Sequence, residues 1–132
     1  MTIRNLGGLL EPASIAVVGP RQFDDAAAHV LLANLAHAGV RVPLYGVALG
    51  GLAEEHAITE VDTLDALPRT PDLAVVLVGP TLAAETVARL GAMGTRAVLF
   101  PARHHDEWPQ EAIRAVQEAA RPARVRIVGP GS

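Results

Sequence analysis

Two polar segments of the chain have residue types that bind metal ions. His104-His105-Asp106-Glu107 places four such side chains in a row, but adjacent histidines rarely reach one ion, and no further ligand follows at helical spacing. Asp24-Asp25 is an acidic pair of the kind that binds magnesium. A site of that kind also needs an Asp at the end of the third strand, where Gly79 stands, and a later Lys, which the chain lacks. We therefore interpret both segments as loops that lead into helix N-termini, where Asp side chains act as caps.

The segment Gly19-Pro20-Arg21-Gln22 is the one best suited to an anion. Gly19 ends an apolar run and leads toward a helix, and backbone N–H groups at such a junction bind phosphate together with the helix dipole. Arg21 adds a nearby positive charge. Taken by themselves, Gly19 and Pro20 are more typical of a tight turn than of a phosphate loop.

A dinucleotide-binding loop is disfavoured at the same junction. Such a loop needs the pattern G-x-G-x-x-G and an acidic residue at the end of the next strand. No matching glycines follow Gly19, and Ala48 occupies the acidic position. We therefore do not expect NAD as a ligand.

Composition excludes several further classes of function. The chain has 132 residues, of which 50% are hydrophobic and 19% charged, so we expect one folded domain. The net charge is −3 and all eleven basic residues are Arg, which argues against nucleic-acid binding and excludes any lysine-based mechanism. No Cys is present, and no Ser-His-Asp order is evident, so we do not expect this segment alone to be catalytic. No apolar run approaches the ~20 residues of a membrane span, and no signal peptide is evident, so we expect a cytoplasmic protein without membrane contact.

Apolar, β-branched runs predict the strands of a parallel sheet. Four of the five runs are nearly continuous rather than alternating, as in strands that are covered on both faces. The second run contains Pro43, which cannot donate to a ladder and fits best as the first residue of its strand. The five runs are residues 15–18, 42–47, 73–78, 97–100 and 125–128.

Helical periodicity fills the gaps between these runs. Apolar residues recur at helical spacing over 28–35, 82–90 and 112–120, and residues 63–67 predict a single helical turn before Pro68. Alternation of strands and helices gives an α/β fold, here a doubly wound parallel sheet of about five strands with helices on both faces. The chain stops soon after the last strand, so we expect residues 1–132 to be one domain of a longer protein.

Ligands of such sheets bind beyond the carboxyl ends of the strands, near the point where the strand order reverses. Four loops lie there in the predicted order. The candidate binding residues that they supply are Gly19, Pro20, Arg21, Gln22, Val47, Ala48, Val78, Gly79, Pro80, Pro101, Ala102 and Arg103.

Several segments in their order and spacing resemble one family. Leu10-Glu11-Pro12-Ala13-Ser14-Ile15-Ala16-Val17-Val18-Gly19 resembles the opening of the CoA-binding domain of NDP-forming acyl-CoA synthetases, a superfamily that includes the alpha subunit of succinyl-CoA synthetase. The spacing from Gly19 to Asn34-Leu35 is similar to that of the family's first loop and helix. Residues 39–45, 73–78, 94–98 and 126–130 resemble further landmarks, so the likeness covers essentially the whole chain.

The resemblance implies a Rossmann-like fold that holds coenzyme A (CoA) or an acyl-CoA at the carboxyl edge of its sheet. It implies that backbone amides after Gly19, with Arg21 and Arg103, contact phosphates, and that loops 46–48 and 78–80 flank the adenine and pantetheine. The family's phosphohistidine lies in a following domain, so none of the five His residues here takes that role. The whole protein would be a synthetase, or a synthetase fused to a GNAT-type lysine acetyltransferase, with the other domains as partners.

Departures from the family pattern leave alternatives open. The usual Pro-Gly-x-x-Gly segment reads Asp24-Asp25-Ala26-Ala27-Ala28 here, Ala48-Leu49 replaces Asn-Pro, and Pro101-Ala102-Arg103 replaces Ser-Ala-Gly. Added β-carbons and two carboxylates oppose the approach of a diphosphate. The chain is therefore either a CoA-binding module, a degenerate relative that serves as a regulatory or oligomerisation scaffold, or a binder of another nucleotide such as cAMP or ADP. The sequence leaves its oligomeric state open, a homo-oligomer included.

Overall fold

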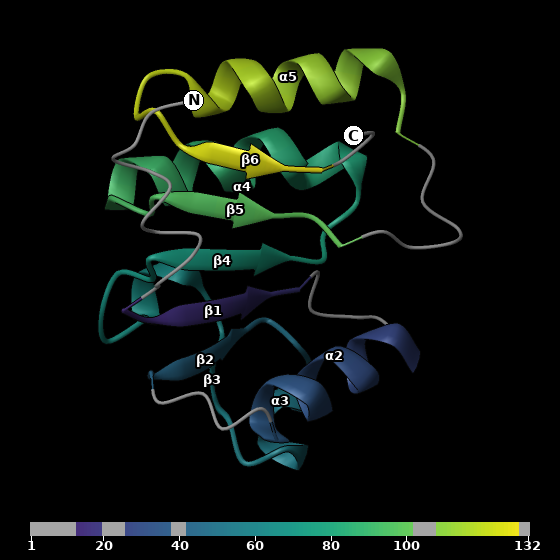
Figure 1. Ribbon diagram of the computed structural model, residues 1–132, viewed down its shortest axis with the longest axis vertical. Helices are drawn as coiled ribbons and strands as arrows, with labels where there is room; N and C mark the ends of the chain where they lie inside the picture. Colours follow the sequence, from purple (N-terminus) through teal and green to yellow (C-terminus); the bar gives the residue numbers. More distant parts are fainter. Residues whose placement is uncertain (1–12, 20–25, 38–41, 102–107, 130–132) are drawn as a thin grey trace.

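The computed structural model describes residues 13–19, 26–37, 42–101 and 108–129. Its centre is a single sheet of parallel strands (Figure 1). The strand order is β3-β2-β1-β4-β5-β6, so the sheet has six strands instead of the expected five or so. The strands are β1 (Ile15–Val18), β2 (Leu44–Val47), β3 (Thr59–Val61), β4 (Leu73–Val76), β5 (Ala97–Leu99) and β6 (Arg126–Val128).

The additional strand is β3, which the prediction missed for a physical reason. Its three residues Thr59, Glu60 and Val61 are only partly buried or exposed, because β3 forms one edge of the sheet. Glu60 and Thr59 are polar, so the segment lacks the continuous apolar run that marked the other strands. Each of the five predicted runs contains one of the other five strands, and Pro43 stands one residue before β2.

The central pair is β1 with β4. All four residues of each strand are buried, and they pair in parallel from Ile15 with Leu73 to Val18 with Val76. Backbone bonds continue past the strands at the carboxyl edge: Leu77 N–H donates to the Val18 carbonyl at 2.7 Å, and Gly19 N–H donates to the Val47 carbonyl at 2.8 Å. These bonds fix the first residues of the loops that follow β1 and β4.

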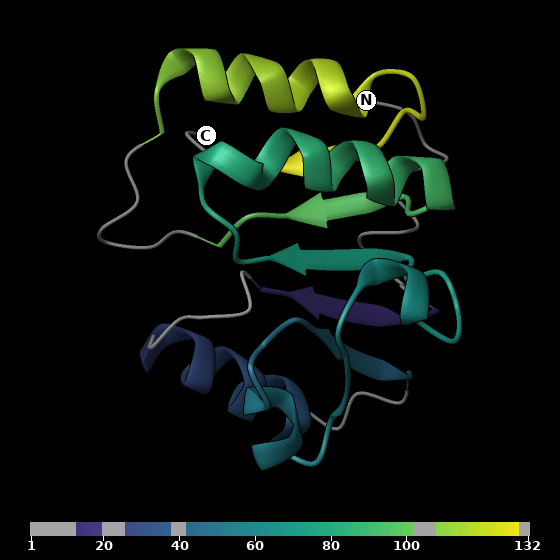
Figure 2. The same cartoon turned by 180° about the vertical axis from the view of Figure 1, so that it is seen from behind.

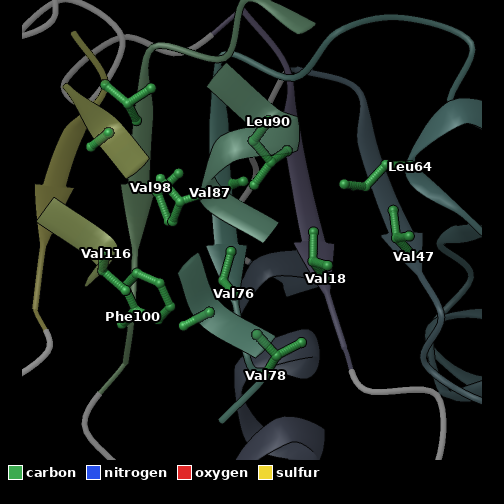
Figure 3. Packing of buried hydrophobic residues seen from close by; sticks show 14 residues of the cluster. Val18, Val47, Leu64, Val76, Val78, Val87, Leu90, Val98, Phe100 and Val116 are labelled. Atoms are coloured by element: carbon green, nitrogen blue, oxygen red, sulfur yellow. The ribbon is translucent and has the colours of Figure 1, made fainter. Parts of the chain in front are cut away.

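Helices cover both faces, which confirms the predicted doubly wound α/β architecture (Figures 1 and 2). The helices α2 (Ala26–His37) and α3 (Leu52–Glu55) supply buried residues to one apolar cluster of the sheet. The helices α4 (Pro80–Met93) and α5 (Gln110–Ala120) supply another, together with the 3₁₀ turn η1 (Leu64–Ala66). Figure 3 shows this second cluster, in which Val87 and Leu90 of α4 lie among valines of the strands.

Local sequence explains the bounds of these elements. Gly79 and Pro80 occupy the N-cap and first position of α4, and Gly94 ends it with φ of 104°, a conformation that favours glycine. The single turn predicted over 63–67 is the 3₁₀ turn η1. The short α3 was not predicted, because four residues are too few to show helical periodicity.

Close packing between β2 and α3 depends on Gly46. A β-carbon at this residue would lie 2.5 Å from the Ala53 Cβ and 2.9 Å from the Leu49 Cδ1. We predict that Gly46→Ala lowers the free energy of unfolding by about 1–3 kcal/mol, because overpacking forces the helix away from the strand.

Urea unfolding followed by circular dichroism measures this effect. The matched control is Gly79→Ala, since a β-carbon at Gly79 meets nothing within 4 Å. There the loss of a glycine N-cap and the reduced entropy of the unfolded chain have opposite signs, so the change is expected to stay within about 0.5 kcal/mol. Equal destabilisation by the two variants would contradict the packing argument.

Candidate functional site

A cavity of about 300 Å³ opens at the carboxyl edge of the sheet, where the strand order reverses. The ends of β1, β2 and β4 meet it through Val18 with Gly19, Val47 with Ala48, and Val78. Its remaining lining comes from the segment after β3, residues 62–64, and from one face of α4. This is the position at which doubly wound sheets bind their ligands.

Four of the predicted binding residues line this cavity: Gly19, Val47, Ala48 and Val78. Gly79 and Pro80 follow directly and form the start of α4, but they do not line the cavity. Pro101 follows the end of β5 and is also absent from the lining. The candidates Pro20, Arg21, Gln22, Ala102 and Arg103 lie outside the described residues, as do the segments 24–25 and 104–107.

Sequence reasoning missed the other wall of the cavity. The α4 residues Leu82, Glu85, Thr86 and Arg89 line it with spacing i, i+3, i+4 and i+7, which is one face of a helix. That spacing was visible in the sequence, but the mixture of one apolar and three polar residues does not mark a buried face. Recognition of β3 would have placed residues 62–64 at the same edge.

The charges at this cavity are mostly negative. Asp62 and Glu85 line it, and Arg89 is the single cationic side chain among the described lining residues. The Arg89 guanidinium lies 3.4 Å from the Asp65 carboxylate on η1, which joins the two walls by an exposed ion pair. The Thr86 hydroxyl donates to the Leu82 carbonyl at 2.8 Å and retains its capacity to accept a hydrogen bond.

The loop after β2 is held by an internal carboxylate. The Glu60 side chain on β3 accepts hydrogen bonds from three backbone N–H groups, those of Leu49 at 3.1 Å, Gly51 at 2.9 Å and Ala53 at 3.1 Å. Ala48 N–H donates to the Val61 carbonyl at 2.9 Å, and Ala48 has φ of 53°, in the left-handed region. These four amides are therefore satisfied within the protein and are not available to a ligand.

Other residues considered from the sequence have structural roles. Ala28 is 1% exposed and packs in the apolar cluster between α2 and the sheet, so its methyl group fills the helix–sheet contact. Trp108 packs edge-on against Phe100, with ring centroids 5.3 Å apart, as expected of a residue that packs at the start of a helix.

His29 and His37 are exposed on α2, and among the described residues no group of three or more His, Cys, Asp or Glu is arranged to hold a metal ion.

The chain belongs to the family described as CoA binding domain, whose model matches residues 13–132. This match confirms the resemblance found in the sequence and identifies CoA or an acyl-CoA as the ligand class of the family.

Solved structures support the fold. A hypothetical protein from Pyrococcus horikoshii OT3 is 20% identical, with a TM-score of 0.60 over 95% of this chain and 81% of that chain. The PH0766 protein of the same organism is 20% identical, with a TM-score of 0.64 over 89% of this chain and 27% of that chain. Biliverdin reductase from Synechocystis sp. PCC 6803, solved with biliverdin and NADP+, is 13% identical, with a TM-score of 0.55 over 88% of this chain and 37% of that chain. The described helices include none with the length and apolarity to span a membrane.

The cavity has the size of a small ligand pocket. Ligand pockets in proteins commonly measure about 300–1,000 Å³ and are largely apolar with a few polar groups. At about 300 Å³, with valine, leucine and alanine beside Thr86 and Arg89, this cavity is at the lower end of that range and combines apolar with polar lining.

The Glu60 interaction is open to a direct test. We predict that Glu60→Ala lowers the free energy of unfolding by about 1–3 kcal/mol, because three partly buried amides lose their acceptor. Hydrogen exchange should accelerate selectively at Leu49, Gly51 and Ala53, and urea unfolding gives the stability.

The control is Glu118→Ala, which removes the same charge from an exposed position of α5. It should change stability by no more than about 0.5 kcal/mol. Unchanged exchange at the three amides in Glu60→Ala would show that Glu60 does not hold the loop.

Proposed function

We propose that this domain binds CoA or an acyl-CoA through its cavity and serves as the CoA-binding module of an acyl-CoA synthetase or a related protein acetyltransferase. Membership in the CoA binding domain family supports the ligand, and the carboxyl-edge cavity supports its location. The observation that carries the proposal is the coincidence of the two: four residues predicted for the ligand, Gly19, Val47, Ala48 and Val78, line one cavity.

In this proposal each wall of the cavity has a separate task. Leu82 is 46% exposed in the wall formed by α4, and it covers one face of the adenine. Val47 and Val78 supply apolar contact from the strand ends. Gly19 has no side chain to block the passage of the 5′-diphosphate from the cavity toward the start of α2, where helix geometry favours an anion.

The role of the domain within a larger enzyme rests on the resemblance and not on the cavity. The same fold accounts for most of one Pyrococcus structure and for about a quarter of another, so it occurs in chains of different length. We infer that the domain delivers CoA to a reaction whose remaining groups come from other domains.

A scaffold that has lost CoA binding is the second candidate. The observation in its favour is the negative lining, since Asp62 and Glu85 oppose the entry of a phosphate. It predicts no affinity for CoA, whereas the first proposal predicts measurable affinity.

Isothermal titration calorimetry with CoA and acetyl-CoA distinguishes the two functions. We predict binding by the native domain and a loss of about tenfold or more in Leu82→Trp, equal to about 1.4 kcal/mol, because the indole fills the space for adenine. Pantetheine, which lacks the adenosine portion, should bind much more weakly than CoA.

The matched control is Ala88→Trp, which adds the same side chain to an exposed position of α4 that does not line the cavity. It should leave CoA affinity within about twofold of the native value. No heat and no thermal shift with millimolar CoA would reject CoA binding and favour the scaffold.

A further inference from the structure

Arg89 is the one described cation that reaches the proposed ligand site. Among the described residues that line the cavity, the other charged side chains are Asp62 and Glu85, both acidic. The adjoining stretch 42–68 contains no Lys or Arg and carries five carboxylates, Glu54, Glu55, Glu60, Asp62 and Asp65. Among the described residues, Arg89 is therefore the one that offers an opposite charge to a ligand phosphate on this side.

The ion pair of Arg89 is of a kind that exchanges readily. Its 3.4 Å separation is long for a charge-assisted hydrogen bond, and the side chains are 47% exposed for Arg89 and 84% exposed for Asp65. Exposed pairs of this type contribute little to stability. A phosphate can therefore replace the Asp65 carboxylate with little loss to the fold.

The chemistry of the guanidinium favours that exchange. Its planar donors match two oxygens of a phosphate at once, and a phosphomonoester carries more charge than a carboxylate. Once Arg89 has turned from η1 to the ligand, Asp65 remains in water, where its charge is solvated.

We propose that Arg89 is the residue that selects for the ribose 3′-phosphate of CoA, which it binds in place of Asp65. This inference rests on the proposed function and extends it, since CoA binding by itself does not require recognition of this phosphate. The 5′-diphosphate passes Gly19, and the 3′-phosphate is the remaining anion of the adenosine portion. Gly19 and Arg89 line the same cavity, so one adenosine can reach both.

The negative charge beside Arg89 makes the binding of the 3′-phosphate depend on that residue. The Glu85 carboxylate lies one helical turn from Arg89 in the same wall and opposes a 3′-phosphate that Arg89 does not neutralise. Removal of Arg89 should therefore weaken CoA while sparing dephospho-CoA, which lacks the 3′-phosphate.

The test compares CoA with dephospho-CoA by calorimetry on three proteins. The native domain should bind CoA about tenfold more tightly, the gain expected of a hydrogen-bonded charge pair. Arg89→Gln should abolish this preference by weakening CoA about tenfold, with dephospho-CoA changed by less than about twofold. Asp65→Asn should strengthen CoA alone, because it removes the competing carboxylate.

Arg121→Gln is the control, since it removes an exposed positive charge that is not part of the cavity. It should leave the ratio of the two affinities unchanged. Thermal unfolding of Arg89→Gln should stay within a few degrees of the native domain, so that altered affinity reports on the ligand.

Three outcomes overturn the inference, and they differ in what else they reject. The native domain could bind both ligands equally, or Arg89→Gln could weaken both to the same extent. Either result would show that Arg89 does not recognise the 3′-phosphate, and the proposed function would still hold. If the native domain binds neither ligand, the proposed function fails and this inference fails with it.

Discussion

The parallel pairing of β1 with β4 is the contact on which the rest of the structure depends. These strands lie next to each other in the sheet although β2 and β3 intervene in sequence, so the sheet grows in opposite directions from them. Right-handed crossovers then place α2 and α3 on one face and α4 and α5 on the other. The helices that follow β1 and β4, α2 and α4, supply the apolar clusters on opposite faces, and the cavity lies at the carboxyl ends of these two strands. The burial of all eight strand residues fixes the position of this opening.

The loops at this edge differ in whether their backbone groups are already engaged. Glu60 acts as an internal anion for the loop after β2 and satisfies three N–H groups that could otherwise bind a phosphate. The Ala48 amide is bound to Val61 in the same loop. In the proposed function, recognition of charge on this side of the cavity therefore requires a side chain, and Arg89 is the described lining residue with a positive charge. The described part of the site thus combines apolar surface with one cation, Arg89, among carboxylates.

The sequence predicted the parts of this architecture that follow from burial. Continuous runs such as Leu73–Val76 were recognisable because both faces of the strand are covered, and Gly79-Pro80 marked the start of α4. The strand β3 was missed because Glu60 uses its side chain to bind backbone amides rather than to pack in the core. The wall formed by α4 was missed for a related reason: Glu85, Thr86 and Arg89 are polar, and their convergence on the cavity depends on how the helix crosses the sheet. Periodicity within one segment contains no information about that crossing.

Cavity shape gives a reason to prefer a ligand-binding role to a purely structural one. Isolated exposed leucines are common in folded proteins, but Leu82 is exposed in a cavity whose lining also includes the small residues Gly19 and Ala48. A domain that serves only as a scaffold would gain about 25 cal/mol for each Å² of this apolar surface that larger side chains covered. Ala48, which lines the cavity, also has a left-handed backbone conformation that is unfavourable for alanine. An open apolar space that is maintained at a cost in stability is understandable if a base occupies it for part of the protein's working cycle.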